Sequence, residues 1–190
     1  MEKTRIKNWK VLDSKRIFNK SWLNVRNITY KLPNGTILKD YFITDYPDWI
    51  SVIAITETGE FVMERQFRPG INGVSLEICG GVIEKTDVNN EEAARRELSE
   101  ETGYEGGKWT KILDICPNAG AQSNKVHVYL AKGVKKVTDM HLDTTEDIEV
   151  FLMKEKEVLE ALKNNEICQA IHVASLWKYF GEKSLITFAK

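Results

Sequence analysis

Apolar residues in the first ninety positions follow patterns that are typical of β-strands. Residues 22–31 are rich in β-branched and aromatic side chains with partial alternation, which predicts a strand. The Asn-Gly pair at 34–35 favours a tight hairpin turn in which both central residues take positive φ, and residues 37–44 then form the partner strand. A nearly continuous apolar run predicts an interior strand over 49–55, and the next strand is expected over 61–67.

Helical patterns begin only in the second half of the chain. Residues 89–98 are good helix formers, with Asn89 and Glu92 at capping-box spacing and Gly103 placed to end the helix in the left-handed region. Two further helical stretches are expected between Lys154 and about Tyr179. The remaining strands are predicted near 109–116, 125–131 and 147–153. This order of elements predicts an α/β sandwich with a mixed sheet.

Composition and charge narrow the class of protein. Apolar residues make up 42% of the 190 residues and charged residues 29%, as in an ordinary soluble domain. A net charge of −1 excludes a large basic surface for nucleic acid. No apolar run is long enough to cross a membrane, and the charged start does not resemble a signal peptide. Cys79, Cys116 and Cys168 are odd in number and widely spaced, so we expect a cytoplasmic protein without disulfides.

Three glutamates on the first predicted helix are the main candidates for chemistry. Glu97, Glu100 and Glu101 stand at i, i+3 and i+4, and therefore share one helix face. Like charges at this spacing destabilise an isolated helix, but a divalent cation such as Mg²⁺ would reverse the effect. A solvated face whose acids pair with Arg95 and Arg96 has the same spacing. Spacing alone leaves both interpretations open.

The surrounding residues resemble the Nudix box, Gly-x5-Glu-x7-Arg-Glu-(apolar)-x-Glu-Glu-x-Gly-(apolar). The second half of that box matches at every fixed position from Arg96 to Tyr104. The resemblance implies a Nudix α/β/α sandwich with a mixed central sheet and an N-terminal antiparallel β arm. It also implies Mg²⁺ as cofactor, with Mn²⁺ as a substitute. The implied metal ligands are Glu97, Glu100, Glu101 and a backbone carbonyl at Gly80 or Gly81.

The front half of the box departs from the family pattern. The expected Glu falls on Val88, and the leading Gly is Gly81, one position earlier than expected. One extra residue therefore lies in the loop between 84 and 90, where Asp87 is the acid nearest to the missing Glu. In the family that Glu mainly holds the loop and helix together. The departure concerns the geometry of the loop more than the metal site.

Segments outside the box resemble ADP-ribose pyrophosphatases and related nucleoside diphosphate sugar hydrolases. The resemblance is carried by residues 65–68, 76–81, 127–131 and 146–150. It implies that Arg65 and Arg68 bind diphosphate oxygens and that Glu77 reaches a ribose hydroxyl or supports the metal ligands. Surface ion pairs for the arginines, and an exposed acid at a strand end for Glu77, are the alternatives.

The resemblance also bears on domain organisation. Residues 1–45 look like the β arm that is swapped between the subunits of a homodimer in those enzymes, and residues 46–190 like the hydrolase domain. We therefore expect a homodimer that acts on a small nucleotide-diphosphate molecule, without nucleic acid or membrane as a partner.

The loop over 118–124 differs from the family at the position of the general base. ADP-ribose pyrophosphatases have a Ser-Pro-Gly loop, and a Glu a few residues later serves as general base. Here Ala119 stands at the position of the Pro and Asn124 at that of the Glu. An asparagine cannot accept a proton from water. Either another acid accepts the proton, with Glu146, Glu100 and Glu101 as candidates, or the substrate differs from that of the family.

The expected activity is Mg²⁺-dependent hydrolysis of the diphosphate bond of a nucleoside diphosphate linked to a sugar or similar group. ADP-ribose is the leading candidate substrate, and GDP-mannose or another nucleotide sugar is the alternative. A Nudix-like sensor would bind the nucleotide without cleaving it, and its box glutamates would be eroded. A Nudix-fold isomerase would need a Cys and Glu pair, for which Cys79 is the nearest cysteine.

Overall fold

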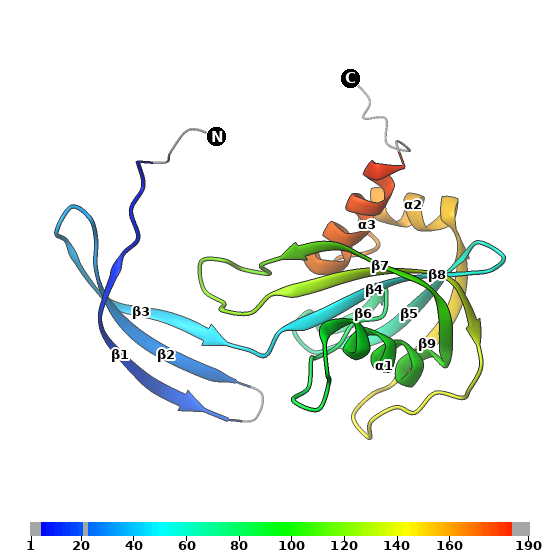
Figure 1. Cartoon of the computed structure of the whole chain (residues 1–190), viewed down its shortest axis with the longest axis horizontal. Coiled ribbons are helices and arrows are strands. Elements are labelled where there is room, and N and C mark those ends of the chain that lie inside the picture. The colour runs from blue at the N-terminus through cyan, green and yellow to red at the C-terminus, as the bar shows by residue number, and fades with distance from the viewer. Residues whose placement is uncertain (1–4, 21–22, 184–190) are drawn as a thin grey trace. The chain divides into compact units, whose positions relative to one another are not determined.

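The computed structural model describes residues 5–20 and 23–183, which divide into two compact units (Figure 1). The first unit comprises the described residues up to Pro47 together with Cys116–Asn124. The second comprises Asp48–Ile115 and the described residues from Lys125 onward. Trp22, the first residue of a predicted strand, lies outside the described residues.

The first unit is built on a three-stranded antiparallel sheet in the order β1-β2-β3. Its strands are β1 (Lys10–Asn19), β2 (Asn24–Lys31) and β3 (Ile37–Asp45). The hairpin at Asn34-Gly35 is confirmed, but only Gly35 takes positive φ, at 89°. Asn34 instead accepts a hydrogen bond from the N–H of Thr36 through Oδ1 (3.0 Å), so the prediction of two positive φ values was wrong. The loop closes through the N–H of Leu32, which donates to the Thr36 carbonyl.

The second unit contains a six-stranded mixed sheet in which β4 and β8 are parallel neighbours. The strand order is β6-β5-β4-β8-β7, and β9 pairs with β5. The strands are β4 (Trp49–Thr56), β5 (Glu60–Arg68), β6 (Gly73–Glu77), β7 (Tyr104–Ile115), β8 (Val126–Lys136) and β9 (Ile148–Lys154). The predicted mixed sheet is therefore confirmed.

Helices cover both faces of this sheet (Figure 1). They are α1 (Asn90–Thr102), α2 (Glu155–Lys163) and α3 (Ala170–Glu182). Side chains alternate along β4, so Val52 packs in the apolar cluster beneath α1 while Ile53 packs in the cluster with α2 and α3. A strand that is buried on both faces reads as a continuous apolar run, as 49–55 does. The α/β/α sandwich is confirmed.

Local sequence explains both ends of α1. The Asn89 side chain accepts hydrogen bonds from the N–H groups of Glu91 and Glu92, which satisfies two donors of the first turn. Gly103 has a φ of 72°, and its N–H donates to the Ser99 carbonyl (2.8 Å). A Cβ on Gly103 would also lie 2.2 Å from the carbonyl oxygen of Thr138, so only glycine fits there. Within the described residues, no helix is both long and apolar enough to span a bilayer.

Candidate active site

The glutamates of α1 do not form a solvated face. Glu97 and Glu101 are buried against the sheet, whereas the side chain of Glu100 is 44% exposed. Glu101 contacts Gly80, because the N–H of Gly80 donates to Oε2 of Glu101 (3.3 Å). The helix therefore directs two carboxylates at one backbone segment, which contradicts a solvated position for Glu97 and Glu101. The ion pairs of the alternative interpretation are present, between Arg95 and Glu91 and between Arg96 and Glu100.

The glycine segment before α1 runs beside β4. The N–H groups of Val52 and Ile50 donate to the carbonyls of Cys79 and Gly81, both at 2.9 Å. Backbone groups alternate in direction along an extended chain, so the N–H and C=O of Gly80 face away from β4, on the side of Glu101. The carbonyl of Gly81 is therefore engaged by β4, whereas that of Gly80 is directed away from this strand.

Gly81 permits the close approach of Glu97. A Cβ on Gly81 would lie 2.2 Å from Cδ of Glu97 and 2.4 Å from each carboxylate oxygen, so a larger residue there would displace the Glu97 carboxylate. The carboxylate of Glu97 thus lies directly against the Gly81 backbone. The leading glycine of the box has a steric role here, namely to let a buried acid reach the segment.

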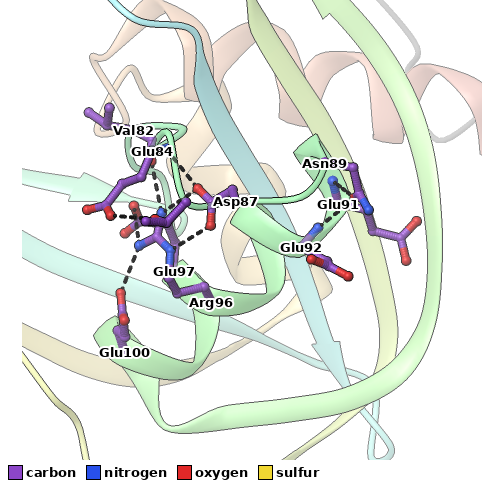
Figure 2. Close-up of polar contacts among 10 residues, drawn as sticks. Val82, Glu84, Asp87, Asn89, Glu91, Glu92, Arg96, Glu97 and Glu100 are labelled. Atoms are coloured by element: carbon purple, nitrogen blue, oxygen red, sulfur yellow. Dashed lines mark hydrogen bonds and ion pairs between the residues drawn. The ribbon is translucent and has the colours of Figure 1, made fainter.

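Arg96 ties the loop before α1 to the carboxylate helix (Figure 2). Its Nε and Nη2 donate to the two oxygens of Asp87, both at 3.0 Å, and Nη2 also donates to the Val82 carbonyl (3.0 Å). Nη1 donates to Glu97 (3.0 Å) and Glu100 (2.9 Å). The hydrogen bonds from Arg96 hold the pKa of Asp87 below its usual range. Arg96 therefore fixes loop and helix as one piece.

Asp87 takes the role of the missing box glutamate, because its carboxylate anchors the loop to Arg96. It also accepts a hydrogen bond from the N–H of Glu84 (2.8 Å), which closes the turn that contains the extra residue. Val88, at the family position of that glutamate, is 82% exposed. The departure noted in the sequence therefore leaves the anchoring contact in place and moves it by one residue.

Buried carboxylates crowd the site, and their charged forms are unfavourable there without a cation. Burial raises the pKa of Glu97 to about 7 and that of Glu101 to about 8. The neighbouring carboxylate of Glu146 raises both values further. Hard divalent cations prefer oxygen ligands, and a cation would offset the repulsion among these groups. The residues present therefore fit a divalent metal.

Glu146 is the one candidate base outside the box. It is half-buried in the segment between β8 and β9, and its Oε2 accepts a hydrogen bond from the N–H of Asp143 (2.9 Å). Its negative charge acts to raise the pKa of both Glu97 and Glu101. Asn124 belongs to the first unit, where its side-chain oxygen and nitrogen are buried without a hydrogen-bond partner among the described residues.

Arg68 and Glu77 form a two-point ion pair at the edge of a cavity. Nε of Arg68 donates to Oε1 of Glu77 (3.0 Å) and Nη2 to Oε2 (2.6 Å). Burial acts to raise the pKa of Glu77, but the hydrogen bonds from Arg68, the charges of His172 and Arg68 and a hydrogen bond from Ser75 together lower it more, so the pKa lies below its usual range. The cavity is about 230 Å³ in volume. It is lined by Trp49, Ile50, Arg68, Gly80, Gly81, Val82, Gln169, Ile171 and His172.

His172 braces this ion pair from α3. It is fully buried, and its Nδ1 accepts a hydrogen bond from the N–H of Ile78 (3.2 Å). Its Nε2 lies 2.8 Å from Nε2 of Gln169 and 3.5 Å from Oε2 of Glu77. Burial lowers the pKa of His172 to about 4, so the ring is neutral at pH 7. No pattern in the sequence connects His172 with Glu77.

The structure separates Arg65 from Arg68. Alternation along β5 puts Arg68 on the α1 face with Glu64, whereas Arg65 points to the opposite face. Arg65 is exposed there, pairs with Glu149 (3.2 Å) and lies 4.2 Å above the ring of Phe151. Of the two arginines expected to bind diphosphate, only Arg68 is placed with the carboxylates.

Sequence reasoning missed Glu64, a buried acid beside the site. Alternation along β5 was the available signal, because it places Glu64 on the same face as Val62 and Arg68. Burial, and then the charges of Glu101 and Glu77, raise the pKa of Glu64 well above its usual range.

Comparison with known proteins gives consistent matches over most of the chain. The family model described as NUDIX domain matches residues 46–172. An ADP-ribose pyrophosphatase of Bacillus subtilis (strain 168) is 32% identical over 162 residues, which cover 85% of this chain and 86% of that protein. A methanol dehydrogenase activator of Bacillus methanolicus is 30% identical over 159 residues, covering 83% and 85%.

More distant matches have the same extent. A GDP-mannose pyrophosphatase of Salmonella typhimurium (strain LT2) is 26% identical over 164 residues, covering 80% of this chain and 85% of that protein. The crystal structure of an ADP compounds hydrolase superposes with a TM-score of 0.82 at 16% identity, covering 97% of this chain and all of the other. At that identity the superposition supports the fold alone.

Proposed function

The chain belongs to the NUDIX family as a diphosphate hydrolase, and we propose that it cleaves nucleoside diphosphates linked to a sugar, with ADP-ribose as the leading substrate. GDP-mannose, the substrate named for more distant relatives, is the alternative. The products would be a nucleoside monophosphate and a sugar phosphate.

One observation carries the proposal. Glu97 and Glu101 are buried against the Gly80-Gly81 backbone, and the ion-paired Arg68 lines a cavity that the same two glycines also line. A diphosphate needs positive partners, and a buried pair of acids needs a cation. A bare nucleotide sensor would have no use for two buried carboxylates of raised pKa.

Nudix hydrolases depend on a divalent metal, and we propose Mg²⁺ here, with Mn²⁺ as a substitute. Glu97, Glu100, Glu101 and the carbonyl of Gly80 would hold it. When bound, such an ion neutralises diphosphate charge and makes a water molecule more acidic.

The chain's own residues orient the substrate and take up the proton. Glu77 engages Nε and Nη2 of Arg68, so the hydrogen atoms on Nη1 are left to donate to a diphosphate oxygen. A guanidinium that is fixed in this way loses little rotamer entropy on binding. We propose Glu146 as the acceptor of the proton from the attacking water, because Glu100 is engaged by Arg96. Glu100 and Glu101 are the alternative acceptors.

We also propose that the protein is a homodimer and that it is cytoplasmic. The sheet of the first unit carries exposed apolar side chains, which supports a homodimer formed through the β arm. They include Val11, Leu12, Ile17, Phe18, Ile37 and Phe42. The three unpaired cysteines support a cytoplasmic location.

A panel of diphosphates tests the proposed substrate class. Purified protein would be incubated with Mg²⁺ and ADP-ribose, GDP-mannose, NADH, diadenosine polyphosphates or oxidised dNTPs, and released monophosphate would be quantified. The proposal expects the highest kcat/KM on ADP-ribose or another nucleotide sugar. A preference for dNTPs, or for dinucleoside polyphosphates, would contradict it.

A further inference from the structure

A second cluster of metal-binding side chains lies behind the box glutamates. Glu64 on β5, Cys79 before the glycine pair, and Glu101 on α1 each place one ligand atom within 4.8 Å of the others. The three residues are 4%, 1% and 5% exposed. Neither Glu64 nor Cys79 belongs to the box, so this grouping exists only because β5, the glycine segment and α1 meet there.

One oxygen of this cluster is left without a partner. Oε1 of Glu64 is buried and, among the residues that the structure describes, accepts no hydrogen bond. Arg68 is the cation that acts on Glu64, but Glu77 already engages its guanidinium at two points. Native proteins seldom leave a buried carboxylate oxygen unpaired, so this oxygen of Glu64 points to a ligand.

We propose that Glu64, Cys79 and Glu101 form an inner site for a thiophilic divalent cation, such as Zn²⁺ or Co²⁺. This inference rests on the proposed function only through Glu101, which the two sites share. Zn²⁺ binds thiolate at about 2.3 Å and carboxylate at about 2.0–2.2 Å in a tetrahedral shell, so two ligand atoms of one ion lie about 3.4–3.6 Å apart. The three ligand atoms lie within 4.8 Å of one another, so side-chain rotation has to bring them together by up to about 1.4 Å.

The donor set determines which cation binds. Two carboxylates and one thiolate suit Zn²⁺ or Co²⁺, whereas Mg²⁺ prefers oxygen ligands alone. On binding, the S–H bond of Cys79 breaks, its proton passes to solvent, and sulfur donates an electron pair to the cation. The Cys79 sulfur and a Glu101 carboxylate oxygen lie within 4.8 Å of each other, so the sulfur is already close to the shared carboxylate.

Cobalt absorption tests the site without measuring activity. The full chain would be stripped of metal with chelator and titrated with Co²⁺, while the sulfur-to-cobalt charge-transfer band is followed in the near ultraviolet. Wild type should develop the band, and Cys79→Ser should lose it. A double variant with Cys116→Ser and Cys168→Ser, which removes the two exposed cysteines, should keep it.

Glu64→Gln provides an independent variant. It keeps the sulfur and should retain the band while weakening Co²⁺ affinity at least about 10-fold. A wild-type protein that binds Co²⁺ without the band, or a band that persists in folded Cys79→Ser, would overturn the proposal. If Cys79→Ser does not fold, a Co²⁺ affinity of Glu64→Gln equal to that of wild type would overturn the proposal.

Hydrolysis measured with Mg²⁺ on the same samples separates the two proposals. A wild-type band without any diphosphate hydrolysis would overturn the proposed function and support the inner site. Hydrolysis by a protein that never shows the band would overturn the inner site and support the proposed function.

Discussion

Asp87 and Arg96 form a two-point ion pair, in which Nε and Nη2 of Arg96 each lie 3.0 Å from an Asp87 oxygen. The pair joins the loop that contains the extra residue to the helix that carries the box glutamates. An insertion of one residue would otherwise leave Arg96 without its acid, since Val88 occupies the family position. Anchoring contacts can therefore move along a loop while the helix stays in place.

Asp87→Ala should destabilise the protein by about 1–3 kcal/mol, because a half-buried guanidinium loses a charged hydrogen-bond partner. Thermal unfolding measures the effect, and kcat/KM should fall with it as Glu97 and Glu100 lose their fixed partner. Val88→Ala is the matched control, and at an exposed position it should change stability by less than about 0.5 kcal/mol. Equal effects of the two substitutions would contradict the role given to Asp87.

Arg68 and Arg65 differ in what they face, and substitution separates them. Arg68→Lys keeps the charge but loses the two-point pairing with Glu77, so KM should rise about 10-fold, as for a loss of 1–2 kcal/mol. Arg65→Lys, on the opposite face, should leave KM nearly unchanged. Steady-state kinetics on the best substrate measure the KM of both variants and of wild type. A larger effect at Arg65 would show that the substrate binds to the other face of β5.

Glu146→Gln should lower kcat by about 100-fold or more with little change in KM, because a general base acts only in the chemical step. Glu149→Gln, an exposed acid that pairs with Arg65, is the control and should keep its kcat. If Glu146→Gln keeps wild-type kcat while Glu100→Gln or Glu101→Gln loses it, the base lies within the box.

The pH dependence of stability follows from the raised pKa values. Glu97 and Glu101 have pKa values of about 7 and about 8 when folded, against 4.5 when unfolded. The folded state therefore holds protons that the unfolded state releases, and metal-free stability should fall as pH rises from about 6.5 to 9. Above about pH 6.5, His172 is mostly neutral in both states and no longer opposes this trend.

Thermal unfolding in chelator at several pH values checks this trend. Added Mg²⁺ should restore stability, and by more at high pH, where the carboxylates are ionised. Glu101→Gln should flatten the metal-free dependence. A metal-free unfolding temperature that rises across this window would contradict the buried like charges described above.

Local signals were sufficient to predict the helix that carries the site. Asn89 and Gly103 act within a turn of α1, so their residue types alone fix where it begins and ends. By contrast, β1 is exposed along its whole length and has no clear alternation, and β6 has only five residues. Both strands exist because a neighbouring strand pairs with them, which no local pattern reveals.

The site shows the same division between local and long-range information. Spacing placed Glu97, Glu100 and Glu101 on one face, but docking on the sheet buries the first and last and leaves Glu100 half exposed. The link from Glu77 to His172 spans 95 positions in the chain and depends on where α3 packs. Side-chain alternation along β5 would have separated Arg65 from Arg68, although both fit the resemblance equally well.

The most direct test of the central claim is release of nucleoside monophosphate from ADP-ribose or the best nucleotide sugar, with and without divalent metal. We expect turnover with Mg²⁺, none in chelator, and a loss of about 100-fold or more in kcat for Glu101→Gln. Glu92→Gln, an exposed acid on the same helix, should retain wild-type turnover. Tight nucleotide binding without turnover at any metal concentration, or an undiminished kcat in Glu101→Gln, would contradict the account.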